Sequence, residues 1–283
     1  MKYSFQDNSS RIRNLKNINI QKFENKKKEG LSIVILNLDK PEYLIPLVEI
    51  LKKSKESFRK ENIFFEILIG DTGSTDQKVI KAYEDSEIKV IKGLKYHFSK
   101  NNNDIAYKNS SGKWILFMNN DIIFQDEKLL FQLYLKAEEN SNIGICGHVL
   151  LFENLTIQHR GIQFFKLNTS TNFMPYHIDG GKSLKEVHLP ESQFFDATTG
   201  AFLMIKSDLF ENVYGFNEDF EKEAQDIDLC LKIRRLGFQI LVLNLGKVIH
   251  FENGTRVKGE ESNFDRSLFV RLWSSFIEGI IVF

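Results

Sequence analysis

Short apolar runs alternate with amphipathic stretches in the first half of the chain. Their length suits strands buried in a parallel sheet, predicted at 31–36, 64–69, 88–91 and 114–118. Helices are predicted between them, from about Pro41, over 76–85 and over 99–111. Strand and helix alternating three times predict an α/β fold, with a mostly parallel, Rossmann-like sheet and helices on its faces.

The pattern loosens after about residue 145. Strand-like runs are predicted at 145–152, 157–165, 200–205 and 238–243. A loop-rich stretch extends to 195, and a helix is predicted over 224–236. This half is expected to share the sheet of the first half. The chain has no internal repeat and no low-complexity tract, which argues against a solenoid.

The same patterns predict how the chain is organised. Residues 1–30 are rich in lysine and asparagine and are expected to form a polar, basic arm. Residues 31–283 are expected to form one domain. Its first half is 31–125, its second half is 126–260, and a C-terminal helical segment covers 261–283.

Composition excludes several classes of protein. The chain is 42% hydrophobic and 27% charged, as globular proteins are, and 38 basic residues balance 38 acidic ones. No net charge therefore draws the whole chain towards nucleic acid. Cys146 and Cys230 lack C-x-x-C spacing, so no zinc knuckle or disulfide framework is indicated, and a reducing compartment fits.

No apolar run reaches the roughly 18 to 20 residues that a membrane span needs. The C-terminal stretch 268–283 comes nearest, but Arg271 and Glu278 interrupt it. The sequence favours a helix packed on the core there, over a helix lying in a membrane interface.

Polar clusters follow four of the predicted strands. Because open parallel sheets bind ligands at the carboxyl ends of their strands, the clusters are expected to converge on one edge of the sheet. The clusters are Asn37-Leu38-Asp39-Lys40, Asp71-Thr72-Gly73-Ser74-Thr75-Asp76, Asn119-Asn120-Asp121 and Gly246-Lys247-Val248-Ile249-His250.

Two of these clusters have structural as well as functional interpretations. Residues 71–76 are typical of a strand-to-helix turn, with Ser74 or Thr75 capping the helix, yet Asp71 could also accept a hydrogen bond from a nucleobase. Asn119-Asn120-Asp121 is a common turn sequence. Its oxygen-bearing side chains at alternate positions could instead face one hard divalent cation, Mg²⁺ or Mn²⁺.

Two further candidates are ambiguous in the same way. Asp226 lies in the first turn of a predicted helix, where a carboxylate stabilises the helix dipole whatever the function. Alternatively, it could act as a general base on a hydroxyl group. His250 is the best placed of six histidines to bind a metal, although a histidine after a strand is often a loop or core residue.

Taken in order, these segments resemble the family 2 glycosyltransferases, and most closely their rhamnosyltransferase-like bacterial branch. Gly70-Asp71-Thr72-Gly73-Ser74-Thr75-Asp76 is similar to the family's V-D-N-G-S-T-D motif. Similar matches run from about residue 31 to 273. They include Ser32–Leu44 with the opening strand and helix, Phe98–Asn103 with F-N-Y-S-x-x-N-N, Met118–Asp121 with L-N-N-D, Gln158–Gly161 with Q-H-A-G, Thr199–Ala201 with T-G-A, Gly215–Glu218 with G-F-D-E, Asp226–Lys232 with D-V-D-L-C-L-R and His250–Glu252 with H-x-E.

The resemblance implies a GT-A fold and inverting transfer of a hexose or deoxyhexose from a nucleotide-diphosphate sugar. The acceptor would be a hydroxyl of a carbohydrate or lipid-linked glycan in bacterial surface polysaccharide synthesis. Residues 31–125 would bind the nucleotide sugar and 126–260 the acceptor. The implied location is cytoplasmic with no nucleic-acid partner, and peripheral association with the inner face of the membrane stays open.

The resemblance also implies residue roles. Asp226 would be the catalytic base. Asn119 and Asp121 stand at the family's D-x-D position, where Mn²⁺ or Mg²⁺ and the diphosphate would lie, and His250 would be a further metal ligand. The expected donor-side residues are Asn37, Asp39, Asp71 (at the nucleobase), Asn103, Asn119 and Asn120. The expected acceptor-side residues are Gly200, Gln225 and Asp228.

Two departures from the family pattern affect these expectations. Asn119 replaces the first carboxylate of D-x-D, which lowers the charge available to a metal and makes Asp121 the stronger ligand. Gln225 stands where the family usually has glutamate, which bears on acceptor positioning or on the tuning of Asp226.

Two rival functions remain. A nucleotidyltransferase could share the layout, but it generally needs a glycine-rich, basic loop after the first strand, where this chain has Asn37-Leu38-Asp39-Lys40. A non-catalytic relative that binds a carbohydrate or a partner is the second alternative, supported by Gln225.

Overall fold

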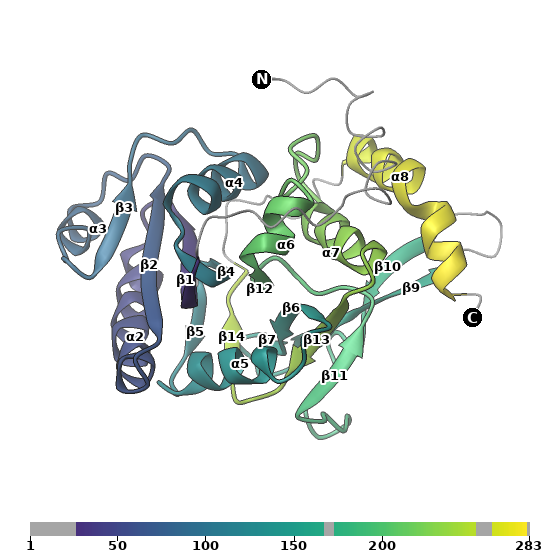
Figure 1. The fold of residues 1–283 in the computed structure, drawn as a ribbon, viewed down its shortest axis with the longest axis horizontal. Coiled ribbons are helices and arrows are strands. Elements are labelled where there is room, and N and C mark those ends of the chain that lie inside the picture. The colour runs from purple at the N-terminus through teal and green to yellow at the C-terminus, as the bar shows by residue number, and fades with distance from the viewer. Residues whose placement is uncertain (1–26, 167–172, 253–261, 282–283) are drawn as a thin grey trace.

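A central eight-stranded sheet organises the computed structural model, which describes residues 27–166, 173–252 and 262–281 (Figure 1). Its strands are β1 (Lys28–Asn37), β2 (Phe64–Asp71), β3 (Ile88–Ile91), β4 (Gly112–Asn119), β6 (Ile143–His148), β11 (Ser192–Phe195), β12 (Phe202–Lys206) and β13 (Gln239–Leu243). In space the order is β11-β13-β6-β12-β4-β1-β2-β3.

The sheet is mostly parallel, because only β11 and β12 run against their neighbours. Strand β12 pairs with both β4 and β6, so strands from the two halves of the chain form one continuous sheet. The register also aligns the strand ends, with Asn37 opposite Asp71 and Leu36 opposite Asn119. The predicted α/β fold with a shared sheet is confirmed.

Helices cover both faces of this sheet (Figure 1). On one face lie α2 (Pro41–Lys60), α3 (Gln77–Ala82) and α5 (Leu129–Glu138). On the other lie α4 (Phe98–Asn109), α6 (Ser207–Asn212) and α7 (Gln225–Arg235).

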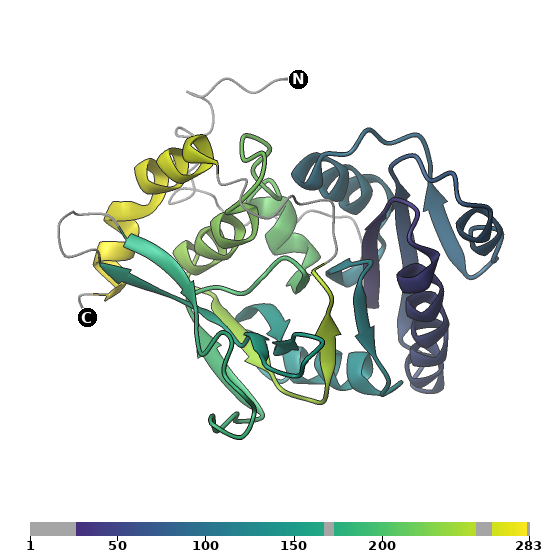
Figure 2. The same ribbon diagram turned by 180° about the vertical axis from the view of Figure 1, so that it is seen from behind.

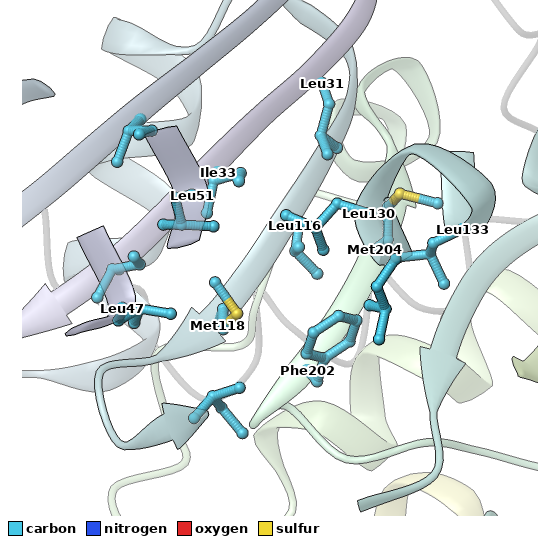
Figure 3. Packing of buried hydrophobic residues seen from close by; sticks show 14 of the residues in the cluster. Leu31, Ile33, Leu47, Leu51, Leu116, Met118, Leu130, Leu133, Phe202 and Met204 are labelled. Carbon is cyan, nitrogen blue, oxygen red and sulfur yellow. The ribbon is translucent and has the colours of Figure 1, made fainter. Parts of the chain in front are cut away.

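Alternation along the strands supplies a core to each face. In β1, Leu31 and Ile33 face α2, while Val34 belongs to the core of the opposite face. Figure 3 shows the first of these cores, where Leu47 and Leu51 of α2 pack beside Ile33. The leucines of α5 fill the neighbouring space against β4 and β12. Burial of these side chains on both faces fixes the sheet edge that carries the polar clusters.

Two small sheets and one further helix complete the fold. One sheet has the order β5-β14-β7-β8, and the other is the pair β9 and β10. Helix α8 (Asn263–Ile281) lies beside β10 (Figure 2) and buries Trp273 and Ile277 completely. The small-sheet strands are β5 (Ile122–Phe124), β7 (Leu150–Leu151), β8 (Ile157–His159), β9 (Ile162–Lys166), β10 (Phe173–His177) and β14 (Val248–His250).

Among the described helices, none has the length and apolar content needed to cross a membrane. Cytoplasmic location and contact with a membrane surface stay predictions.

Several boundaries differ from those expected. Strand β1 begins at Lys28, inside the predicted arm, and residues 1–26 lie outside the described part of the chain. The stretch before 195, predicted to be loop-rich, contains β10 and β11. Helix α5 was not predicted, because its apolar residues occupy consecutive positions and give no clear helical period.

Candidate functional site

A cavity of about 260 Å³ lies at the carboxyl ends of β1 and β4. Six of the predicted site residues line it, and they come from three separate segments of the chain. They are Asn37, Asp39, Asn119, Asn120, Asp121 and Gly200. The cavity is completed by residues that the sequence did not single out as site residues, namely Leu36, Leu38, Lys40, Tyr43, Thr72, Tyr96, Phe98, Asn102, Phe117 and Met118.

A chain of hydrogen bonds connects the strand ends beside this cavity. Asn120 donates to Asn37 Oδ1 at 2.7 Å, and the amide nitrogen of Asn37 lies 2.9 Å from the hydroxyl oxygen of Tyr83. The Tyr83 hydroxyl donates to Asp71 Oδ1 at 3.0 Å. Burial raises the pKa of Tyr83 to about 12, so the hydroxyl keeps its proton and remains a donor. No sequence signal identified Tyr83, because its partners are remote in the chain.

Asp39 joins the loop after β1 to the loop after β2. Its Oδ1 accepts the backbone N–H groups of Thr75 and Asp76 at 2.6 and 2.8 Å. These two hydrogen bonds, with that from Asp76 the stronger influence, lower the pKa of the Asp39 carboxyl. The expected cap of the following helix was wrong: Asp76 caps α3, while Ser74 Oγ accepts the backbone N–H of Asp39.

Asp71 and Asn103 lie beside the cavity wall rather than in its lining. Asp71 is only 6% exposed, and its Oδ1 also accepts the Ser74 backbone N–H at 3.1 Å. Asn103 exchanges two hydrogen bonds of 2.9 Å with the backbone of Phe216. Its neighbour Asn102 lines the cavity instead. The donor-binding role predicted for Asp71 and Asn103 stays a prediction.

Asn119, Asp121 and His250 come together at one side of the cavity. His250 Nε2 lies 3.3 Å from Asp121 Oδ1 and 3.1 Å from the amide nitrogen of Asn119. The antiparallel pairing of β14 with β5 places His250 opposite Ile122 and so beside Asp121. Strand alternation is not the reason for this arrangement, since β4 ends at Asn119 and a turn follows.

This set of side chains fits a divalent cation. Ligand atoms on one octahedral Mg²⁺ lie about 3 Å apart, given metal–oxygen distances of roughly 2.0–2.1 Å. The 3.3 Å between His250 Nε2 and Asp121 Oδ1 is close to that spacing, and the carboxylate supplies an oxygen ligand of the kind that Mg²⁺ and Mn²⁺ prefer. The Asn119 amide presents its nitrogen to His250, so it would have to turn over to supply its oxygen. In the described part of the chain, no group of three or more His, Cys, Asp or Glu side chains is placed to hold a metal ion.

Asp226 is held by Gly200, a residue of the cavity lining, without lining the cavity itself. It belongs to the first turn of α7, and its Oδ2 accepts the backbone N–H of Gly200 at 2.7 Å. Gly200 lines the cavity, whereas Asp226 lies directly behind it. A Cβ atom at position 200 would lie 3.1 Å from Asp226 Cβ, so only glycine leaves this approach uncrowded.

Gln225 and Asp228 face the interior rather than the cavity. Gln225 is 5% exposed and donates a long hydrogen bond of 3.5 Å to the Phe220 carbonyl. Asp228 is fully buried. Its two oxygens contact Lys232 Nζ at 2.8 Å and Trp273 Nε1 at 2.9 Å, which ties α7 to α8. Asp228 and Asp226 thus face different directions, as residues two apart in a helix do.

Buried histidines near the site make stability depend on pH. Burial lowers the pKa of His148 from 6.5 to about 4. Above pH 6.5 the ring is neutral in both states and its contribution to stability is fully present. As pH falls towards 4, the unfolded chain binds a proton that the native state does not, so stability is lost.

We therefore expect His148 to lower the free energy of unfolding by roughly 2 kcal/mol between pH 7.5 and pH 5. Urea unfolding of the wild type and of His148→Gln at both pH values measures this contribution as a difference. Carboxylates that titrate in both proteins then cancel. An equal loss of stability in the two proteins would contradict the prediction.

The sheet and the cavity at its strand ends, lined by polar groups, define an α/β protein with a candidate ligand site. Residues 32–208 match the model of the family described as Glycosyl transferase family 2. The chain belongs to this family.

Two proteins with similar sequences are bacterial. The chain is 25% identical over 230 residues to the O-antigen biosynthesis protein RfbC of Myxococcus xanthus, covering 80% of this chain but only 18% of that protein. It is 23% identical over 214 residues to the rhamnosyltransferase WbbL of Escherichia coli K12, covering 71% of this chain and 78% of that one.

Solved structures show that the fold is of the GT-A type. GalNAc-T7 with UDP, GalNAc and Mn²⁺ gives a TM-score of 0.64 at 13% identity, over 89% of this chain and 50% of that chain. The Pyrobaculum calidifontis mannosyltransferase PcManGT with GDP-Man and Mn²⁺ gives 0.55 at 9% identity, over 97% and 79%. The chain is thus a member of glycosyl transferase family 2 with a fold of the GT-A type.

Proposed function

We propose that the protein transfers a sugar from a nucleotide-diphosphate sugar to an acceptor hydroxyl, with a divalent cation and with inversion at the anomeric carbon. One observation carries this proposal: backbone hydrogen bonds beside the cavity connect Asp226 with the metal-side cluster, which is Asn119, Asp121 and His250. The Asn119 N–H donates to the Ala201 carbonyl at 3.0 Å, and the adjacent Gly200 N–H holds Asp226.

The chain's own residues have distinct parts in this reaction. Asp226 would remove the proton from the attacking hydroxyl, since a neutral hydroxyl is a weak nucleophile. The Gly200 N–H donates to Oδ2 of Asp226 and the Ile227 N–H donates to Oδ1, which together orient the carboxylate. Asn119, Asp121 and His250 would hold Mn²⁺ or Mg²⁺, which when bound neutralises charge on the diphosphate leaving group.

The arrangement of carboxylates supports single displacement. Among the described residues that line the cavity, the carboxylates are Asp39 and Asp121. Asp39 Oδ1 accepts two backbone N–H groups, and Asp121 faces His250. Neither is arranged as a nucleophile for a covalent sugar intermediate, and a single displacement by the acceptor inverts the configuration.

The relatives' names support a substrate class. One is an O-antigen biosynthesis protein and another a rhamnosyltransferase, so we propose a hexose or deoxyhexose donor and a carbohydrate or lipid-linked glycan acceptor in bacterial surface polysaccharide synthesis. Since the chain spans 18% of the first of these relatives and 78% of the second, this assignment concerns the transferase domain.

The test is a transfer assay with a panel of nucleotide sugars and Mn²⁺, run with and without glycan acceptors. NMR of the product gives the anomeric configuration. Donor binding without hydrolysis or transfer would identify a non-catalytic relative. Pyrophosphate formed from a sugar phosphate and a nucleoside triphosphate would identify a nucleotidyltransferase, and retained configuration would reject the inverting mechanism.

A further inference from the structure

We propose that the neighbouring residues Gln158 and His159 are positioning residues for opposite sides of the site. Gln158 orients His250 on the metal side, and His159 holds the segment Thr198–Gly200 that carries the hydrogen bond to Asp226. Both residues lie in β8, where successive side chains point in opposite directions. The inference rests on the proposed function. It assigns roles to residues of the segment Gln158–Gly161, which does not line the cavity.

The contacts of Gln158 indicate which ring nitrogen of His250 carries a hydrogen. The Gln158 amide nitrogen donates to the backbone carbonyl of His250 at 3.2 Å, and a carbonyl can only accept. Its Oε1 therefore faces His250 Nδ1, at 2.7 Å, and must receive a proton from it. In a neutral ring this leaves Nε2 unprotonated, towards Asn119 and Asp121. An unprotonated Nε2 is the form of histidine that binds a cation.

A similar argument indicates which ring nitrogen of His159 carries the hydrogen. The backbone N–H of Thr199 can only donate, and it points to His159 Nε2 at 3.4 Å, while the Thr198 hydroxyl lies 3.0 Å from the same nitrogen. The proton of the neutral ring is therefore on Nδ1, which donates to His177 Nδ1 at 3.1 Å. His159 is 1% exposed, and burial lowers its pKa well below the usual value, so the ring stays neutral.

The segment Thr198–Gly200 has little freedom to move between its partners. On the side of α7, the Thr198 backbone contacts Cys230 Sγ at 3.5 Å through its N–H, and Gly200 binds Asp226. A Cβ atom at Gly147 would lie 2.0 Å from Thr198 Oγ1, so glycine is needed for the close approach of β6. His159 contacts the same segment through the Thr198 hydroxyl and the Thr199 N–H. Its loss would displace the segment and, through Gly200, the proposed base.

His148 provides a matched control for His159. It too is buried, and its Nε2 accepts a backbone N–H, from Leu245 at 3.1 Å. Leu245 follows β13 and makes no hydrogen bond to Thr198–Gly200 within the described part of the chain, although His148 itself follows Gly147 in β6. Gln163 is the corresponding control for Gln158, because its side chain bonds only the exposed Tyr176 hydroxyl among the contacts described. A purely structural role would make each residue and its control behave alike.

The metal-side test measures Mn²⁺ binding by the electron paramagnetic resonance signal of the free ion. We expect Gln158→Leu to weaken binding 10- to 100-fold, the usual scale for losing a group that orients a metal ligand. Saturating Mn²⁺ should restore most of its turnover, and Gln163→Leu should match the wild type. Unchanged Mn²⁺ affinity in Gln158→Leu would overturn this half of the proposal.

The base-side test compares His159→Leu, His159→Gln and His148→Leu. The glutamine oxygen can replace Nε2 as acceptor, so His159→Gln should keep most turnover. His159→Leu should lose turnover on the order of 10- to 100-fold with Mn²⁺ affinity unchanged. Hydrogen exchange followed by mass spectrometry should show at least about tenfold faster exchange over 198–200 in His159→Leu alone.

The outcomes separate this inference from the proposed function. A wild type that neither binds Mn²⁺ nor transfers sugar would reject the proposed function and the role of Gln158, while the exchange of 198–200 would still decide that of His159. An active wild type with equal exchange and turnover in His159→Leu and His148→Leu would overturn the role of His159. If His159→Leu fails to fold, His159→Gln and His159→Asn decide it: asparagine places its oxygen near Nδ1 and should lose the turnover that glutamine keeps.

Discussion

Asp226→Asn is expected to lower turnover on the order of 100-fold or more, the usual scale for losing a general base. Asparagine has nearly the same shape but cannot take a proton. Its single oxygen can keep the hydrogen bond from Gly200, while the contact between Asp226 Oδ1 and the Ile227 N–H, 2.9 Å in the native protein, is lost. That loss costs about 1 kcal/mol of stability. Donor affinity, measured by calorimetry, should change little.

Asp228→Asn is the matched control two residues further along α7. It leaves the Lys232 ammonium, whose side chain is 8% exposed, without its buried carboxylate. We expect a loss of about 3 kcal/mol in the free energy of unfolding, since breaking a buried ion pair is strongly destabilising. Turnover of the folded enzyme should stay within a few-fold of the wild type. Near-normal turnover in Asp226→Asn would remove the proposed base and leave the fold unaffected.

Removal of divalent cations is expected to abolish transfer, and Mn²⁺ or Mg²⁺ should restore it. The diphosphate leaving group is negatively charged. A cation held at Asp121 and His250 would neutralise that charge as the group departs. Asp121→Ala should lower kcat/KM on the order of 100-fold and weaken both Mn²⁺ and donor binding, because it deletes the one carboxylate in this cluster.

Asp126→Ala tests whether such losses are specific to the site. Asp126 is an exposed aspartate that bonds the Lys128 N–H in a nearby turn, so its replacement should affect neither metal nor donor binding. Full activity of the wild type in excess chelator would contradict the metal-side role of Asp121 and His250. A loss of stability in Asp121→Ala with donor affinity retained would make Asn119-Asn120-Asp121 a structural turn.

The sequence predicted the sheet because the buried strands are continuous apolar runs, and it predicted the convergence of polar clusters because each follows such a run. It could not predict the contacts of Tyr83 with Asn37 or of Gln158 with His250, because these partners are 46 and 92 residues apart in the chain. Such contacts arise only when the sheet is assembled.

Local geometry limited the prediction in other places. Successive helix residues point about 100° apart, so the sequence did not show that Asn102 rather than Asn103 would line the cavity. Asp76 was not chosen as the cap of α3 because the competing groups, Ser74 and Thr75, are equally good capping types. Their own contacts with Asp39 settle the matter, and those contacts span more than 30 residues.

The antiparallel pairing of β12 with β4 has a consequence for altering substrate choice. Because Phe202 pairs with Met118 in the same ladder, the segments that carry the proposed base and the proposed metal ligands belong to one sheet in the described chain. Backbone geometry would therefore set the distance between the proposed base and the proposed metal site, whichever donor binds. Variant libraries at the exposed cavity residues Leu38 and Tyr96 can therefore be screened for new donors. The proposed base and the proposed metal ligands should keep their spacing in such variants.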